Sequence, residues 1–178
     1  MTIIDRNRHI LIICCLIFER KMANCGNYIK IIYDIWQSVQ IYRLILTMAP
    51  AAARTINDFL TDTHTDAEDY DLIVTGDLGY TGTELLHELL EIEYRRDIRK
   101  QHADCGLMIF NLKEQDVNSG GSGCGCSGSV LCSHLMKRMR LRELHRVLFL
   151  ATGALMSPTS AKQGQPIPGI AHAVLLER

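Results

Sequence analysis

The chain has 178 residues, a length that suits one domain with a substantial core. Its net charge of −1 and pI near 6.6 argue against a dedicated nucleic-acid-binding protein, so no nucleic acid is expected among its partners. Seven cysteines at irregular spacings leave one over in any pairing scheme, which favours a reducing, cytoplasmic setting over a disulfide framework.

The amino-terminal segment differs in composition from the rest of the chain. Residues 1–48 hold twelve isoleucines, and all four prolines follow Met48. The longest apolar run, His9 to Phe18, is shorter than the ~20 residues that span a bilayer. It is followed by a poor signal-peptide cleavage site. We assign no fold to residues 1–47 and expect a truncated or frameshifted front end, joined to a genuine domain at residues 48–178.

From Ala49 onward, helices and strands are expected to alternate. In chain order we expect a helix with the stripe Ala51 to Leu60, a strand Tyr70–Thr75, a helix opened by a capping box at Thr81 and Glu84, a strand Gly106–Leu112, a helix ending near Arg142, and strands His145–Thr152 and Ile170–Glu177. This order predicts an α/β layered fold with a largely parallel sheet flanked by helices.

The Gly/Cys loop, residues 120–128, gives the strongest indication of binding. Its five glycines allow the backbone to approach a ligand closely, and a helix-competent run follows directly. The backbone N–H groups at such a helix start favour an anion. Contact of Ser122, Gly123 and Cys124 with a ligand and a purely structural tight turn both remain open.

Other chemistry-bearing residues have weaker patterns. Cys124, Cys126, Cys132 and His134 lack the usual spacing of zinc ligands, so no metal site is expected. Cys126 has no base beside it in the sequence that would make it a nucleophile. His172 lies between two alanines on an apolar strand and is either a core histidine or a ligand group.

A basic run, Lys137 to Arg142 with Arg146 beyond it, has two interpretations. Basic residues late in a helix complement the helix dipole and face water. They also suit contact with anionic lipid.

Several segments resemble the C-terminal half of the stage V sporulation protein AD family, which is thiolase-like and found in spore-forming Firmicutes. They are residues 48–53, 71–79, 120–127, 146–158 and 167–174. The resemblance implies the C-terminal half of a thiolase-like layered fold, without the first half. An isolated half would expose a face that another chain, such as a second copy in a homodimer, covers; otherwise the product is an unstable fragment.

The resemblance also implies that the chain is not an enzyme. Condensing enzymes of the thiolase superfamily use a cysteine from the first half, and a histidine and an asparagine from the second. Gly76 and Ser122 stand at the histidine and asparagine positions here, and a glycine cannot polarise a carbonyl or carry a proton. We expect no catalytic residue and no cofactor. An acyl-thioester condensing enzyme or acyltransferase that uses Cys126, and a scaffold for membrane channel subunits, are kept as alternatives.

The family is implicated in binding dipicolinic acid and taking it up into the forespore. The implied partners are therefore dipicolinate, with or without Ca²⁺, and other stage V sporulation A membrane proteins. By analogy, Gly76, Asp77 and Gly153 join the Gly/Cys loop around one cavity, and His172 is a further candidate. Asp77 either assists Ca²⁺ or caps a turn. The implied location is cytoplasmic, with peripheral attachment to the inner forespore or spore membrane left open.

Overall fold

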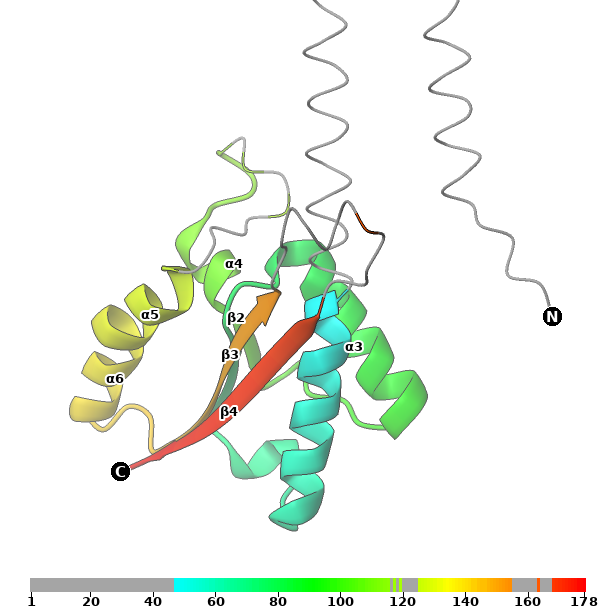
Figure 1. Ribbon diagram of the computed structural model, residues 1–178. Coiled ribbons are helices and arrows are strands. Elements are labelled where there is room, and N and C mark those ends of the chain that lie inside the picture. Colours follow the sequence, from blue (N-terminus) through cyan, green and yellow to red (C-terminus); the bar gives the residue numbers. More distant parts are fainter. Residues whose placement is uncertain (1–46, 116, 118, 120–124, 155–162, 164–167) are drawn as a thin grey trace, which may run out of the picture. The chain divides into compact units, whose positions relative to one another are not determined.

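The computed structural model describes residues 47–115, 117, 119, 125–154, 163 and 168–178. All of them belong to one compact unit, Ile41–Arg178. Residues 47–62 are helical. The later elements are η1 (Ala67–Asp69), β1 (Leu72–Thr75), α3 (Gly79–Tyr94), β2 (His102–Asp104), α4 (Cys105–Ile109), α5 (Cys126–Val130), the π-helical η2 (Leu131–Leu135), α6 (Met136–Arg140), β3 (Arg146–Ala154) and β4 (Gly169–Glu177) (Figure 1).

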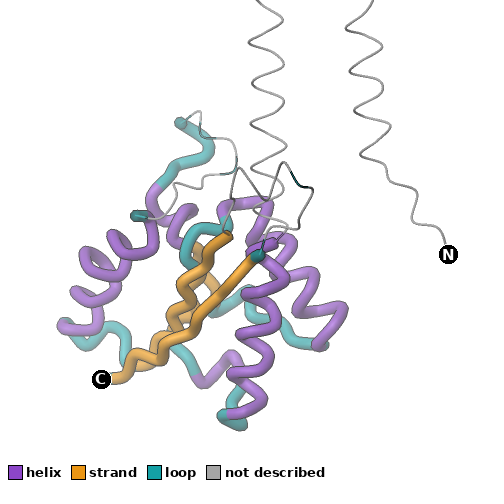
Figure 2. The backbone as a smooth tube through the Cα atoms, viewed as in Figure 1, coloured by secondary structure: helices purple, strands orange, loops and turns teal. Residues whose placement is uncertain are grey.

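The sheet has the strand order β2-β1-β3-β4. β1 runs parallel to both β2 and β3, while β4 is antiparallel to β3. Helices lie on both sides of the strands (Figure 2). The expected fold class, a largely parallel sheet flanked by helices, is confirmed.

Alternate side chains of the central strands belong to two apolar clusters, one on each face of the sheet. Ile73 and Leu148 are opposite each other and pack with helix 47–62 and α3. Val74 and Val147 point to the other face and pack with α4, α5, η2 and α6. Because successive strand residues face opposite ways, burial on both faces explains the unbroken apolar runs of β1 and β3.

The helical run after the Gly/Cys loop contains a π-helical segment, which keeps its apolar stripe on the sheet. The buried residues Cys126, Val130, Leu135 and Met139 are separated by four, five and four positions. In a continuous α-helix, the five-residue step would rotate Leu135 by roughly 140° from Val130. The π-helical bonding of η2 absorbs the extra residue, so both sides of the step face the sheet.

Two expectations about local structure are wrong. The strand expected at Gly106–Leu112 is replaced by β2, which ends at Asp104, and by α4. The Asp104 side chain accepts from the Gly106 N–H and starts that helix immediately after the strand. The capping box expected at Thr81 is also absent, because α3 begins at Gly79.

The other expected elements are confirmed with small boundary shifts. Helix 47–62, β1, β4 and the helical run that ends at Arg140 lie where the sequence places them. β3 extends to Ala154, two residues beyond the expected end of the strand at Thr152. Its residues continue the antiparallel pairing with β4, up to Ala154 opposite Gly169.

Candidate functional site

The carboxylate of Asp104 lies where β1, α3 and α4 meet. It accepts the Thr75 hydroxyl at 2.7 Å, the N–H groups of Leu78 and Gly79 at 2.8 and 3.0 Å, and that of Gly106 at 3.0 Å. Asp104 is 1% exposed. Burial raises the pKa of Asp104, and the donated hydrogen bonds oppose that shift. The aspartate therefore caps two helices and one strand end from a single buried position.

This arrangement fills the anion position at the start of α3 with a side chain of the protein. The next N–H groups of α3 are also engaged, since Tyr80 donates to the Ser119 carbonyl at 2.7 Å and Thr81 to the Ser119 hydroxyl at 3.1 Å. A helix start attracts an anion through its unpaired N–H groups. At α3 these groups have protein partners.

A chain of hydrogen bonds leads from Asp104 to two histidines. His102 Nε2 lies 3.0 Å from Thr75 Oγ1, and His102 Nδ1 lies 3.0 Å from His87 Nε2. Because Thr75 donates to Asp104, its oxygen accepts from His102, which in turn accepts from His87. Burial, and then the neighbouring His87, lower the pKa of His102 to about 3, and burial lowers the pKa of His87. A neutral imidazole at His102 suits this chain of bonds.

Gly76 brings the end of β1 against β3 and the start of α5. A Cβ placed on this buried glycine would lie 3.1 Å from the Leu150 carbonyl oxygen, the Thr152 nitrogen and the Ser127 Cβ. Two of these three atoms are backbone and cannot move independently. The close approach therefore favours glycine, because a larger side chain would have to displace these neighbouring atoms. It also places the helix start after the Gly/Cys loop beside the end of β1.

Asp77 has an unusual backbone conformation in the turn between β1 and α3. Its φ is 131°, in the region that favours glycine. Its N–H donates to Asp104 Oδ1 at 3.3 Å. A non-glycine residue in such a region stores strain, and strained residues of this kind often cluster at functional sites. The first N–H groups of α3 are accepted by Asp104.

Thr152 carries a buried hydroxyl without a hydrogen-bond partner among the described residues. Its own backbone nitrogen is one of the atoms that crowd Gly76. Its side chain comes two positions after Leu150 on β3, on the face of the sheet that packs with helix 47–62 and α3. An unsatisfied buried hydroxyl normally costs free energy. Gly153, the next residue, has ordinary space around it, since an added Cβ would lie 3.7 Å from Ile170.

Comparisons with known proteins show which family this chain belongs to. A family model described as Stage V sporulation protein AD (SpoVAD) matches residues 33–177. The chain belongs to this family. It is 47% identical over 131 residues to Stage V sporulation protein AD of Bacillus subtilis (strain 168). The alignment covers 74% of this chain but only 38% of that relative. Membership of the SpoVAD family supports a role in sporulation.

The remaining candidates of this SpoVAD-family chain are spread over the unit. His172 is exposed on β4, opposite Ala151, so its interpretation as a core histidine is wrong. Ser122, Gly123 and Cys124 lie outside the described residues. The structure thus brings together Gly76, Asp77 and the Thr152–Gly153 segment, with His172 on the adjoining strand.

The cysteines of the described segments differ in environment. Burial raises the pKa of the Cys105 thiol to about 12. Cys126 is 3% exposed and packs in the apolar cluster that contains Cys105. Cys132 and His134 are exposed, and within the described residues no three His, Cys, Asp or Glu side chains are placed to hold a metal. Nor does any described helix have the length and hydropathy needed to cross a membrane.

Proposed function

We propose that this chain is a non-catalytic protein of sporulation that binds dipicolinic acid, with or without Ca²⁺, for uptake into the forespore. Its membership of the SpoVAD family supports the biological setting. The single observation that carries the binding site is the close approach of Gly76 to Ser127 and to the backbone of Thr152, whose buried hydroxyl has no hydrogen-bond partner among the described residues. Dipicolinate is a planar pyridine with two carboxylates, and each carboxylate needs several donors.

The donors come from three places. The N-cap of α5 is Gly125, which has no side chain to occupy the helix start, and the helical run continues to Arg140. The loop residues Ser122, Gly123 and Cys124 add backbone N–H groups and one hydroxyl. Thr152 adds a second hydroxyl, and a carboxylate is the acceptor that would satisfy it.

Asp77 has a different role in this proposal. A carboxylate beside a dianion is favourable when a divalent cation lies between them, and Ca²⁺ prefers such oxygen ligands. The strained backbone of Asp77 supports a function for this residue. Gly153 and His172 extend the same region toward β4.

The absence of catalysis is part of the proposal. The glycine at position 76 supports it, because glycine has no side chain to polarise a thioester carbonyl, and a larger side chain there would have to displace atoms of β3 and α5. The burial of Cys126 argues against its use as an acyl-accepting nucleophile. The remaining partners we propose are other stage V sporulation A membrane proteins, with the chain peripheral to the inner forespore membrane.

Calorimetric titration of the full chain with dipicolinate, with and without Ca²⁺, tests this function. Thr152→Val removes the hydroxyl at the site, and we expect affinity to fall by about ten-fold, the cost of one hydrogen bond to a charged group. Thr83→Val is the matched control, since Thr83 in α3 carries the other unsatisfied buried hydroxyl of the described residues. It should bind like the parent.

Two outcomes would contradict the proposal. Equal affinity of the Thr152 and Thr83 variants would remove Thr152 from the site. A parent that shows no saturable binding, together with labelling of Cys126 by an acyl-thioester probe, would replace the proposal by the condensing-enzyme alternative. Ser122→Trp extends the test to the Gly/Cys loop, where a bulky side chain should block binding.

A further inference from the structure

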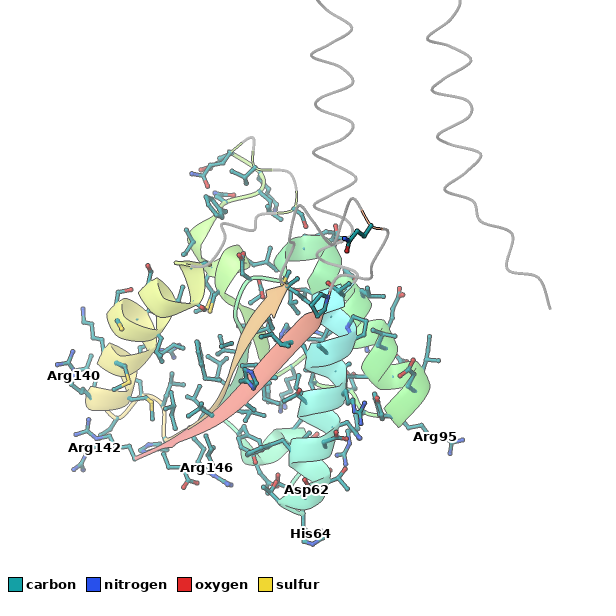
Figure 3. The ribbon with its side chains drawn as sticks, viewed as in Figure 1. Asp62, His64, Arg95, Arg140, Arg142 and Arg146 are labelled. Carbon is teal, nitrogen blue, oxygen red and sulfur yellow. The ribbon has the colours of Figure 1, made fainter. Side chains whose placement is uncertain are left out.

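The end of α6 and the turn that follows it form a cationic surface that the proposed ligand site does not use. We call this surface the basic tip, and its cationic residues are Lys137, Arg138, Arg140, Arg142 and Arg146. Figure 3 shows Arg140, Arg142 and Arg146 projecting from the same end of the unit. Residues from the helix, the turn and the start of β3 therefore share one surface.

The acidic residues nearby neutralise only part of this charge. Glu143 pairs with Arg138 at 3.1 Å, and Glu177 pairs with Arg146 at 2.9 Å. Asp71 also lies at this end, where the backbone N–H groups of His145 and Arg146 donate to it.

Three cations of the basic tip have no ion pair with any described residue. They are Lys137, Arg140 and Arg142, and all three are exposed. The whole chain has a net charge of −1, so positive charge is concentrated here against the overall balance. Such a local excess attracts an anionic partner.

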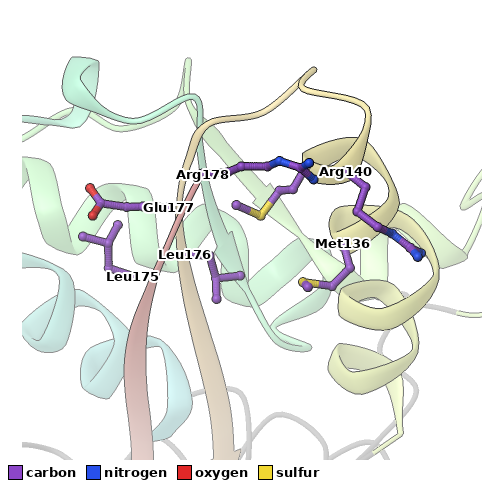
Figure 4. A pocket seen from close by; sticks show the side chains of 7 residues that line it. Met136, Arg140, Leu175, Leu176, Glu177 and Arg178 are labelled. Atoms are coloured by element: carbon purple, nitrogen blue, oxygen red, sulfur yellow. The ribbon is translucent and has the colours of Figure 1, made fainter.

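An exposed apolar residue stands among these cations. Leu141 is 61% exposed between Arg140 and Arg142, and the positive φ of Arg142, 62°, ends the helical path at this point. At the start of α6, Met136 is 42% exposed and lines a groove with Leu176 and Arg140 (Figure 4). One exposed leucine is ordinary, but a leucine flanked in sequence by two arginines that have no ion pair with a described residue has the chemistry of an interfacial anchor.

We infer that the basic tip docks on the surface of an anionic lipid bilayer. The guanidinium groups would bind lipid phosphates, and Leu141 would enter the headgroup region. A bilayer is favoured over an acidic polypeptide because it offers negative charge and an apolar interior at the same place. The inference rests on the proposed peripheral location, and not on dipicolinate binding.

Sedimentation of the full chain with phosphatidylglycerol-containing vesicles tests this inference, with phosphatidylcholine vesicles for comparison. The parent should bind only the anionic vesicles and should be released by high salt. Combining Lys137→Glu, Arg140→Glu and Arg142→Glu should weaken binding by about a hundred-fold, given about 1 kcal/mol for each basic residue near such a surface. Leu141→Ser should weaken it by about ten-fold, through lost apolar burial.

A matched control variant carries the same change of charge elsewhere on the unit. Arg95→Glu, Lys100→Glu and Lys113→Glu alter three exposed cations that have no ion pair with a described residue. This variant should bind anionic vesicles much better than the basic-tip variant does. Circular dichroism of both variants checks that they are folded.

Three results would overturn the inference. The parent could fail to bind anionic vesicles, or the two charge-reversal variants could bind them equally. Competition by polyglutamate, with no effect of Leu141→Ser, would indicate an acidic protein segment as the partner instead. Dipicolinate titration of the basic-tip variant keeps the two proposals separate, since its ligand binding should match the parent.

Discussion

The hydroxyl of Thr75 donates to the carboxylate of Asp104 across 2.7 Å, although the two residues are 29 positions apart in the chain. Thr75 closes β1 and Asp104 closes β2, and the parallel register places them opposite each other. The same carboxylate holds the first N–H groups of α3. The turn that carries Gly76 and Asp77 is therefore built around a buried acceptor from the neighbouring strand.

Replacing this acceptor should be costly. Asp104→Asn presents an amide N–H₂ to a site where every described neighbour donates, so at least one buried N–H group loses its acceptor. We expect a loss of about 3 kcal/mol in the free energy of unfolding, measured by urea denaturation. Asp71→Asn is the control, because exposed Asp71 also accepts two backbone N–H groups, from His145 and Arg146. An equal loss in both variants would contradict the role of burial at Asp104.

The close packing at Gly76 predicts opposite effects for two glycine-to-alanine changes. Gly76→Ala places a methyl group 3.1 Å from backbone atoms of β3 and should cost about 1–3 kcal/mol. Gly128→Ala adds a methyl group to α5 where nothing lies within 4 Å, and should stabilise by about 1 kcal/mol. Thermal denaturation of both variants measures these two opposite changes in stability. A Gly76→Ala protein as stable as the parent would show that the strand ends separate easily.

The two hydrogen-bonded histidines predict a loss of stability in mild acid. The pKa of His102 is lower in the folded protein, so the unfolded chain takes up the proton first as pH falls below about 6.5. Stability due to His102 is complete above that pH and declines until about pH 3. By pH 5 the loss should be about 2 kcal/mol. The lowered pKa of His87 acts in the same direction.

Urea denaturation of the parent and of His102→Gln at several pH values between 7 and 5 measures this effect. The variant should show a shallower decline, whatever its stability at neutral pH. The raised pKa of Asp104 works in the opposite direction at lower pH, because the folded state then binds its proton more readily. Parallel curves for parent and variant would contradict the assignment to His102.

Asp77 should be a position where the structure is strained. Asp77→Gly relieves a φ of 131° and should stabilise the fold by about 1 kcal/mol, measured by thermal denaturation. Asp58→Gly, in helix 47–62, should instead lose about 1 kcal/mol. If Asp77 also holds Ca²⁺, the Asp77→Gly protein should lose the Ca²⁺-dependent part of dipicolinate binding. A lower stability of the Asp77→Gly protein than of the parent would contradict the claim that the Asp77 backbone is strained.

The amino-acid pattern predicts elements whose burial is apolar and continuous. β1 and β3 are buried on both faces, and their apolar runs identify them directly. β2 was missed because it contains His102 and Asp104, whose polar side chains are satisfied by hydrogen bonds across the fold. Local propensity does not report such partners, since they come from distant segments.

The candidate site, too, was predicted from local sequence features and not from contacts between distant segments. Gly76 and Asp77 were predicted from their motif, and Gly76 lies close to the backbone of Thr152. Asp104 and His102 were missed, although a polar pair flanked by apolar segments is a weak indication of a buried network. The positive φ of Asp77 has no signal in the sequence, because the residue is not glycine.

The π-helical segment η2 sets the rotational phase between the two ends of its helical run. Residues before it lie beside Gly76, and residues after it carry the basic tip. Ordinary α-helical bonding through Leu131–Leu135, with no residue removed, would turn α6 by roughly 100° relative to α5. Met139 would then turn to the side that Arg140 occupies, so the π-helical bonding of η2 keeps the proposed ligand site and membrane surface in their mutual orientation.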